Sequence, residues 1–450
     1  MATRFVDLDR DTALLLPPDL RDWVPANHLV HFLIDAVEKL DLRQIQVNTR
    51  GTGDAQYPPA MLLALLVYSY ATGVFGSRRI EQSTFDNVAV RLLTADTHPD
   101  HDTICTFRRE NKALFSESFV KVLQLAQELK LAQFGQITVS VDGTKVAANA
   151  SKHAAVSYER AGQNIAQLEL EVEQLVAKAE QADATPLQDG LSIPAEIVRR
   201  QERKAALEKA RAQIETRAHA RYAVELADYE KKMAARQARA DRGDKPRGKP
   251  PAPPSPAPTP KEQHNFTDPE SRIMKTGGGF EQCYNAQAAV EVESRLIVGE
   301  RVSQAPNDKQ ELVPSVAAIA PEAGPVAAVL TDSGFYSEAA VQKIEQTPAG
   351  ESTGTTVYAA MEKTSHHRSV ADLEKQPEPE APSPAASVGE KMRHRLKTAA
   401  GKSLYKLRQQ TVEPVFGIIK SAMGFRQFLL RGTAKVSTEW TLVCLAYNVR

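Results

Sequence analysis

Apolar residues recur at helical spacing over the first third of the chain. Residues 60–74 form the longest apolar stretch, and two prolines precede it, where a helix N-terminus tolerates proline. Residues 77–94 are amphipathic, and Asp102 or Thr103 can cap a helix that follows. These repeats predict a helical N-terminal domain over residues 1–135.

The period then changes from helical to alternating. In residues 137–141 apolar side chains alternate with polar ones, which predicts a strand that ends at Asp142 and Gly143. Residues 326–330 are continuously apolar and lead towards Asp332, a pattern typical of a buried central strand. Strands are predicted at 137–141, 284–291, 296–302, 326–331 and 356–360, with the first and fourth as neighbours in one mixed sheet. Because helical segments separate several of these strands, the fold class is α/β.

A segment of different composition interrupts the predicted sheet. Residues 157–240 are dense in Glu, Gln, Lys and Ala, with apolar positions that repeat by three and four residues. Two long helices folded back on each other would bury these positions, as an antiparallel helical hairpin. Eight prolines follow between Pro246 and Pro260, which predicts an extended linker. The predicted domains are the helical one at 1–135, a core formed by 136–156 and 263–450, a hairpin insertion at 157–245 and a linker at 246–262.

Composition restricts the class of protein. At 450 residues the chain exceeds one compact core, and its 42% hydrophobic and 25% charged residues are typical of a folded globular protein. Lys and Arg number 56, as do Asp and Glu, which excludes a uniformly basic protein but leaves a basic face open. Three widely separated cysteines argue against a disulfide framework or a Cys-rich zinc site and favour a reducing cytosol. We expect no signal peptide and no membrane span.

Three carboxylates are candidates for a metal site. Asp142 and Asp332 each follow a predicted strand, and sites in open α/β sheets gather at the carboxyl ends of strands. Together with Glu413, they could hold two divalent ions that activate a water or a 3′-hydroxyl for phosphodiester chemistry. The structural alternatives remain open. An Asp-Gly pair is usually a turn, and Glu413 before Pro414 can either begin a helix or mark a kink.

The charge around Glu413 indicates a phosphate polymer as the substrate. Eleven lysines and arginines lie between Lys391 and Lys435, and Glu413 is the only acidic residue among them. Basic residues that face a polyanion, with the glutamate holding a cation, explain this pattern. Lys420 lies two helical turns after Glu413 and shares its helix face.

Several long motifs now identify a family resemblance. They are VDGTKVAANASKH, NFTDPESRIMKTGGGFEQCYNAQAAV, VLTDSGFYS and LYKLRQQTVEPVFGIIK, preceded by YPPAMLLALLVYSYATGVFGSRRIEQ and DHDTICTFRREN. The set resembles bacterial insertion-sequence transposases that combine a DDE catalytic domain with an InsH-type N-terminal domain. The resemblance covers about residues 15 to 450, with the motifs in the family's order.

The resemblance implies an RNase H-like fold, with Asp142, Asp332 and Glu413 as the metal-binding triad. It also implies a tyrosine, an arginine and a lysine around the glutamate, which are here Tyr405, Arg408 and Lys420. The tyrosine-to-arginine and glutamate-to-lysine gaps match the family signature. The arginine-to-glutamate gap holds four residues where the signature has three.

The activity implied is transposition of an insertion sequence. The enzyme would hydrolyse phosphodiester bonds at the element ends and transfer the 3′-ends to target DNA. Two Mg²⁺ ions would be the cofactor, with Mn²⁺ as a substitute. Double-stranded DNA would be the partner, bound by a homodimer that assembles on it at the cytoplasmic nucleoid.

We expect the N-terminal domain to supply recognition of element ends, because it carries four candidate arginines and none of the three carboxylates. Its candidate DNA-binding residues are Arg78, Arg79, Arg108 and Arg109. For Arg108 and Arg109 a plain surface helix is an equally open interpretation. Two other functions remain: a catalytically decayed remnant that still binds DNA, and a coiled-coil assembly protein suggested by residues 157–240 alone. The chain stops at Arg450 inside an apolar periodic segment, whereas family members continue, so the activity of this copy is a separate question.

Overall fold

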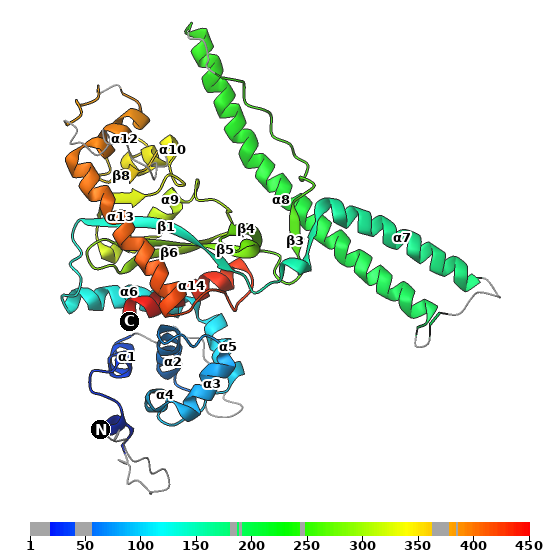
Figure 1. Cartoon of the computed structure of the whole chain (residues 1–450), viewed down its shortest axis with the longest axis horizontal. Coiled ribbons are helices and arrows are strands. Elements are labelled where there is room, and N and C mark those ends of the chain that lie inside the picture. Colours follow the sequence, from blue (N-terminus) through cyan, green and yellow to red (C-terminus); the bar gives the residue numbers. More distant parts are fainter. Residues whose placement is uncertain are drawn as a thin grey trace, which may run out of the picture. The chain divides into compact units, whose positions relative to one another are not determined.

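The computed structural model describes residues 19–40, 56–180, 187–188, 191–243, 248–361, 378–383 and 386–450. The chain divides into two compact units (Figure 1). The first unit combines Met1–Val146 with Tyr284–Arg450, and the second is Ala147–Cys283. The second unit is therefore inserted into the sequence of the first.

The N-terminal part of the first unit is helical. Its helices are η1 (Leu20–Trp23), α1 (Leu29–Glu38), α2 (Pro59–Ala71), α3 (Ser77–Asp86), α4 (Val88–Leu93), α5 (His101–Glu110) and α6 (Lys112–Glu128). The predicted helix at 77–94 is two helices, because Asn87 ends α3 and its side chain caps α4. Asp100 caps α5 by accepting hydrogen bonds from the backbone N–H groups of Asp102 and Thr103, the two residues that we expected to be caps.

A mixed sheet forms the centre of the fold. Its strands are β1 (Ile137–Ala147), β4 (Arg272–Thr276), β5 (Gly279–Glu291), β6 (Ile297–Ser303), β7 (Val326–Thr331) and β8 (Thr356–Ala359). Their order is β4-β5-β1-β7-β8, and β6 also pairs with β5. The β1–β7 and β7–β8 pairs are parallel, whereas β5 pairs antiparallel with β4 and β6. The predicted adjacency of the first and fourth strands is confirmed by the β1–β7 pairing.

The strand β1 does not end where the sequence predicted. Asp142 and Gly143 lie inside β1, which continues to Ala147, and they do not form a turn after it. The 13-residue strand β5 supplies a partner for this extension. By contrast, β7 ends at Thr331, as predicted, so that Asp332 follows the strand directly.

Helices complete the first unit. They are α9 (Leu312–Ala317), the short η3 (Pro321–Ala323), α10 (Glu338–Glu345), α12 (Val388–Lys397), α13 (Ala399–Gly417), the π-helical η4 (Ile418–Ala422) and α14 (Thr433–Val449). Pro414 lies inside α13, so Glu413 neither begins this helix nor ends it. The last helix is central: α14 packs against α2, α5, α6 and β6, and Trp440 donates a hydrogen bond to the carbonyl of Gln287 at 3.0 Å. This packing joins the N-terminal helices to the sheet.

The second unit contains the long helical hairpin. Residues Lys152–Ala154 form η2, β2 (Ala155–Ser157) pairs with β3 (Gln263–Asn265), and α7 (Tyr158–Glu180) packs on α8 (Ile193–Asp241) (Figure 1). The helices are antiparallel, because Lys204 of α8 pairs with Glu169 while the later Arg211 bonds the earlier Tyr158. Buried residues along the seam are Val156, Ala161, Leu168, Leu207 and Ala210.

The proline-rich segment returns along α8. Arg236 donates a hydrogen bond to the carbonyl of Gly248 at 2.8 Å, and Arg221 bonds Glu262 at 2.6 Å. The described part of the linker is therefore hydrogen-bonded to α8 near both ends of the linker. The 49-residue length of α8 is what provides this support.

Candidate active site

Asp142 lies on β1 and is partly buried, with a side chain that is 20% exposed. Its Oδ1 accepts a hydrogen bond from the backbone N–H of Gly143 at 2.7 Å. Burial raises the pKa of Asp142 to about 7; the Gly143 hydrogen bond and the charge of Arg408 act against this rise, and the charges of Asp332 and Asp308 add to it. Asp142 thus lies within electrostatic reach of a second predicted carboxylate.

Asp332 is placed by the end of β7. Its Oδ1 accepts a hydrogen bond from the backbone N–H of Gly334 at 2.8 Å, which fixes the carboxylate in a tight turn. The hydroxyl of Tyr405 donates to the carbonyl of Thr331, the preceding residue, at 3.1 Å. Burial raises the pKa of Tyr405, and the charge of Asp332 contributes to the rise. The tyrosine therefore holds α13 against the end of β7, beside Asp332.

Arg408 contacts both Asp142 and Glu413. Its Nη1 is 3.5 Å from Oδ2 of Asp142, and its Nη2 donates to Oε1 of Glu413 at 3.2 Å. Residues five apart on a helix do not share a face, so the second contact depends on the length of the arginine side chain. The Arg408 side chain is 12% exposed and that of Glu413 is 52% exposed. The longer gap between these two residues does not prevent the arginine from bridging Asp142 and Glu413.

Lys420 connects the π-helical turn to β1. Its Nζ donates to Oγ1 of Thr144 at 2.5 Å and to the carbonyl of Lys145 at 2.9 Å. The ammonium group lies next to the strand segment that follows Asp142. Arg408 thus links Asp142 to Glu413, and Lys420 contacts the strand segment after Asp142. Tyr405 contacts the residue before Asp332.

The three carboxylates fit a metal ion in their chemistry. Carboxylate oxygens are the ligands that Mg²⁺ and Mn²⁺ prefer, and a cation would relieve the repulsion between Asp142 and Asp332. Within the described part of the chain, no three His, Cys, Asp or Glu side chains are grouped closely enough to hold an ion. Glu413 is paired with Arg408, so binding by all three carboxylates requires a rearrangement of this pair.

The basic window between Lys391 and Lys435 lies largely on the surface. Eight of its eleven basic residues are exposed: Lys391, Arg393, Lys397, Lys402, Lys406, Arg426, Arg431 and Lys435. The remaining three face the protein, where Arg395 pairs with Glu345 at 2.6 Å and Arg408 and Lys420 make the contacts described above. These eight side chains place positive charge at the surface of the protein.

The predicted DNA-binding arginines differ in their exposure. Arg78, Arg79 and Arg109 are exposed. Arg108 is 3% exposed, and its Nη1 donates to the Tyr70 hydroxyl at 2.9 Å and to the Phe75 carbonyl at 2.8 Å. The expectation that Arg108 contacts DNA is wrong, because its guanidinium belongs to a buried network.

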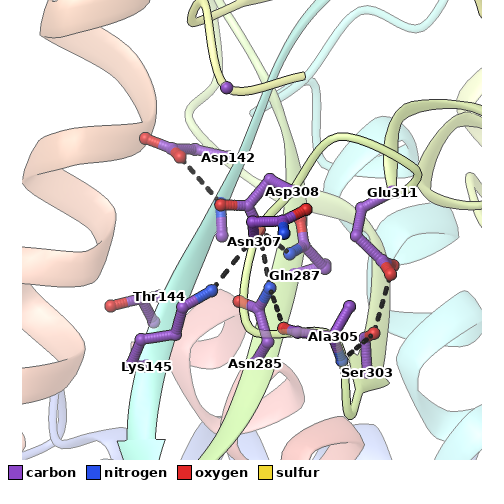
Figure 2. Close-up of polar contacts among 12 residues, drawn as sticks. Asp142, Thr144, Lys145, Asn285, Gln287, Ser303, Ala305, Asn307, Asp308 and Glu311 are labelled. Carbon is purple, nitrogen blue, oxygen red and sulfur yellow. Dashed lines mark hydrogen bonds and ion pairs between the residues drawn. The ribbon is translucent and has the colours of Figure 1, made fainter. Parts of the chain in front are cut away.

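Figure 2 shows a polar cluster beside Asp142 to which the sequence analysis gave no role. Asp308 lies on the loop after β6, and the side chains of Lys145 from β1 and of Asn285 and Gln287 from β5 turn towards it. A signal was present in the sequence: Asn285 and Gln287 are polar residues two apart in a stretch of β5, residues 283–290, that is otherwise apolar. Because residues two apart share a sheet face, this pattern indicates a buried polar contact.

Comparisons with known families bear on both ends of the chain. The family described as Transposase domain (DUF772) matches residues 18–110, and the family described as Transposase DDE domain matches residues 374–450. No curated protein and no solved structure gives a match. The DDE match contains Tyr405, Arg408, Glu413 and Lys420 and does not extend to Asp142 or Asp332. The two matches are consistent with a DDE transposase of an insertion sequence.

Proposed function

We propose that this protein is a transposase that hydrolyses phosphodiester bonds at the ends of an insertion sequence and transfers the resulting 3′-ends to target DNA. The observation that carries the proposal is the double contact of Arg408, which joins Asp142 on β1 to Glu413 on α13. The Tyr405 contact beside Asp332 brings in the third carboxylate. The two transposase matches support the same conclusion independently.

The sheet supports an RNase H-like fold. Its order places β4, β5 and β6 on one side of β1, where β5 pairs antiparallel with β4 and β6, and the parallel strands β7 and β8 on the other. The candidate carboxylates then come from the central strand, from its parallel neighbour and from a helix late in the chain. Such an arrangement lets one site draw on residues far apart in the sequence.

Asp142, Asp332 and Glu413 would hold the divalent cations, with Mg²⁺ as the expected ion. When bound, the metal supplies an activated oxygen nucleophile and stabilises the charge on the leaving oxygen. Arg408 contacts two of these carboxylates, Asp142 and Glu413. Tyr405 and Lys420 fix α13 and the π-helical turn to the sheet, which limits how far Glu413 can move from the other two.

The exposed basic window would contact the DNA backbone without reading its sequence. Lysine and arginine contacts to phosphates provide affinity and register, while base contacts provide specificity. Arg78, Arg79 and Arg109 of the N-terminal helices would contribute to recognition of the element ends. On DNA we expect a homodimer, because transposition joins two ends.

The proposal is tested with purified protein and the DNA that flanks its gene. We expect cleavage and 3′-end joining with Mg²⁺ and neither reaction in EDTA. Asp142→Asn, Asp332→Asn and Glu413→Gln should each reduce both reactions to background, because each removes a metal ligand. All three variants should still shift end DNA in a mobility assay, since loss of an anion does not weaken attraction to DNA.

A surface carboxylate provides the matched control. Asp228→Asn on α8 removes an exposed acid that pairs with Lys232, and it should cut DNA like the wild type. Wild-type cleavage by Asp332→Asn would show that the assigned triad is wrong. A wild-type protein that binds element ends but never cuts them would instead identify a catalytically decayed transposase.

A further inference from the structure

Asp308 is held by three side chains from two strands. Its Oδ1 accepts hydrogen bonds from Asn285 Nδ2 at 2.6 Å and from Gln287 Nε2 at 2.7 Å. Lys145 Nζ lies 3.6 Å from the same oxygen. The Asp308 side chain is 21% exposed, and both amide residues are fully buried. Figure 2 shows Lys145, Asn285 and Gln287 converging on this carboxylate.

The two amides are costly to bury for structural reasons alone. Asn285 Oδ1 and Gln287 Oε1 are buried and have no hydrogen-bond partner, while both amide N–H₂ groups point to one carboxylate oxygen. A buried polar group without a partner costs about 1–3 kcal/mol, and an apolar pair would avoid that cost. We therefore look for the role of this arrangement in the backbone that it contacts.

Gly143 of β1 is the residue that the cluster touches. A Cβ at Gly143 would lie 2.3 Å from Gln287 Nε2, 2.7 Å from Asp308 Oδ1 and 2.9 Å from Asn285 Oδ1. No side chain fits there, so the backbone of β1 rests directly on the cluster. Successive residues of a strand point to opposite faces, which leaves Asp142 free to face α13.

The same backbone holds the carboxylate of Asp142. The N–H of Gly143 donates to Asp142 Oδ1 at 2.7 Å, so the peptide that packs on the cluster also orients the carboxylate. A shift of this peptide would turn Asp142 away from its position. The cluster and the carboxylate of Asp142 thus contact the same short backbone segment, at Gly143.

We propose that Asp308 is a positioning residue for Asp142: by binding Asn285, Gln287 and Lys145 it supports the backbone at Gly143 and so fixes the carboxylate that receives the divalent ion. The role as metal ligand rests on the proposed function. The role in fixing the β1 backbone does not depend on it.

The loop that carries Asp308 also offers a matched control. Glu311 lies three residues later, accepts a hydrogen bond from Ser303 Oγ at 2.7 Å and pairs with Arg301. These contacts anchor the loop to β6 and do not involve β1. Glu311→Gln therefore perturbs the same loop without removing the support beneath Gly143.

Mn²⁺ binding to the full-length protein tests the proposal, with free Mn²⁺ measured by electron paramagnetic resonance. Asp308→Ala should raise the dissociation constant about 10–100-fold, the range typical of groups that orient a metal ligand. Asp308→Asn keeps an oxygen that accepts both amide hydrogen bonds and should change binding by less than about threefold. Glu311→Gln should bind as the wild type does. A folded Asp308→Ala protein with wild-type Mn²⁺ affinity would overturn the proposal.

Two further measurements separate positioning from simple loss of structure. If Asp308→Ala does not fold, Gln287→Met tests the proposal in its place. This substitution removes one hydrogen-bond donor to Asp308 and keeps a side chain of similar volume. Weaker Mn²⁺ binding at an unchanged melting temperature supports the proposal, and unchanged binding refutes it. Hydrogen exchange at the Gly143 amide, measured without metal, should be faster in the variant that folds. If the wild type binds no Mn²⁺, the metal site of the proposed function fails, and the exchange rate alone then decides the role of Asp308.

Discussion

Glu300 is a carboxyl group that the proposed chemistry does not use. It lies on β6, its Oε1 accepts a hydrogen bond from Thr441 Oγ1 of α14 at 2.6 Å, and its Oε2 is buried without a partner. Burial raises the pKa of Glu300 to about 7, against the opposing effects of Thr441, Lys112 and Arg301. In the folded protein this group is therefore neutral over a pH range in which an unfolded chain would ionise it.

The consequence is a pH-dependent loss of stability. The contribution of the neutral Glu300 is complete below the ordinary glutamate pKa and is lost as pH rises through about 7. Glu300→Gln cannot ionise at this position. The difference in unfolding free energy between this variant and the wild type should therefore shift by about 2–3 kcal/mol in favour of the variant when the pH rises from 5 to 8. Urea denaturation at both pH values measures this. The exposed Glu293→Gln is the control, and a Glu300→Gln difference that stays constant with pH would contradict the prediction.

At the scale of elements, three helices meet at a buried charged network. Arg108 of α5 donates to the hydroxyl of Tyr70 on α2, which donates to Glu439 of α14 at 2.9 Å. Glu439 also accepts the backbone N–H groups of Leu429 and Leu430 at 2.9 Å each. Burial raises the pKa of Glu439, and the charge of Arg108 opposes the rise. The network fastens the N-terminal helices to the C-terminal helix.

A double-mutant cycle tests this fastening. Arg108→Met leaves a buried carboxylate without its cation and should cost about 3–5 kcal/mol of unfolding free energy. Glu439→Gln should cost a similar amount, because the arginine then lacks its anion. The double variant removes both charges and should lose clearly less than the two single losses combined. Guanidinium denaturation supplies the values. Losses that simply add would show that the two groups act independently.

At the scale of the molecule, the helical hairpin of the second unit begins and ends at one small ladder. Ser157 pairs with Gln263 at the end of the β2–β3 ladder, directly before α7 and after the return segment. Replacing residues 158–262 by Asn-Gly would convert β2 and β3 into a two-residue hairpin. We expect a soluble protein that still unfolds cooperatively, with a smaller helical signal by circular dichroism. An insoluble product would show that the hairpin is required for the first unit to fold.

The DNA binding that we propose is also tested at the scale of the whole molecule. Changing Arg78, Arg79 and Arg109 to Ala together should weaken binding to element ends. Each lost phosphate contact should lower the slope of log K against log salt by about 0.9. Arg199→Ala on α8 removes an exposed arginine of the other unit and serves as the control. Filter binding over a salt series gives the slopes; an unchanged slope in the triple variant would place end recognition elsewhere.

The sequence by itself determined the elements with a strong local pattern. Alternation and a continuous apolar run predicted the strand that contains Asp142 and the strand that precedes Asp332, and their predicted adjacency is confirmed. The repeats of residues 157–240 predicted the helices α7 and α8. These features are readable because each depends on side chains only a few residues apart, which share one face of a helix or strand.

Only the tertiary structure decided which polar residues are buried and what they contact. Arg108 is buried because it donates a hydrogen bond to Tyr70, and Tyr70 in turn donates to Glu439. Glu439 lies on α14, more than 300 residues later in the chain. Asp142 lies inside β1 and not in a turn, because the long β5 supplies a partner strand. Asp308 acquires its neighbours only when the loop after β6 returns to β1 and β5. Burial and electrostatics depend on groups that packing brings together from distant parts of the chain, and no local pattern records them.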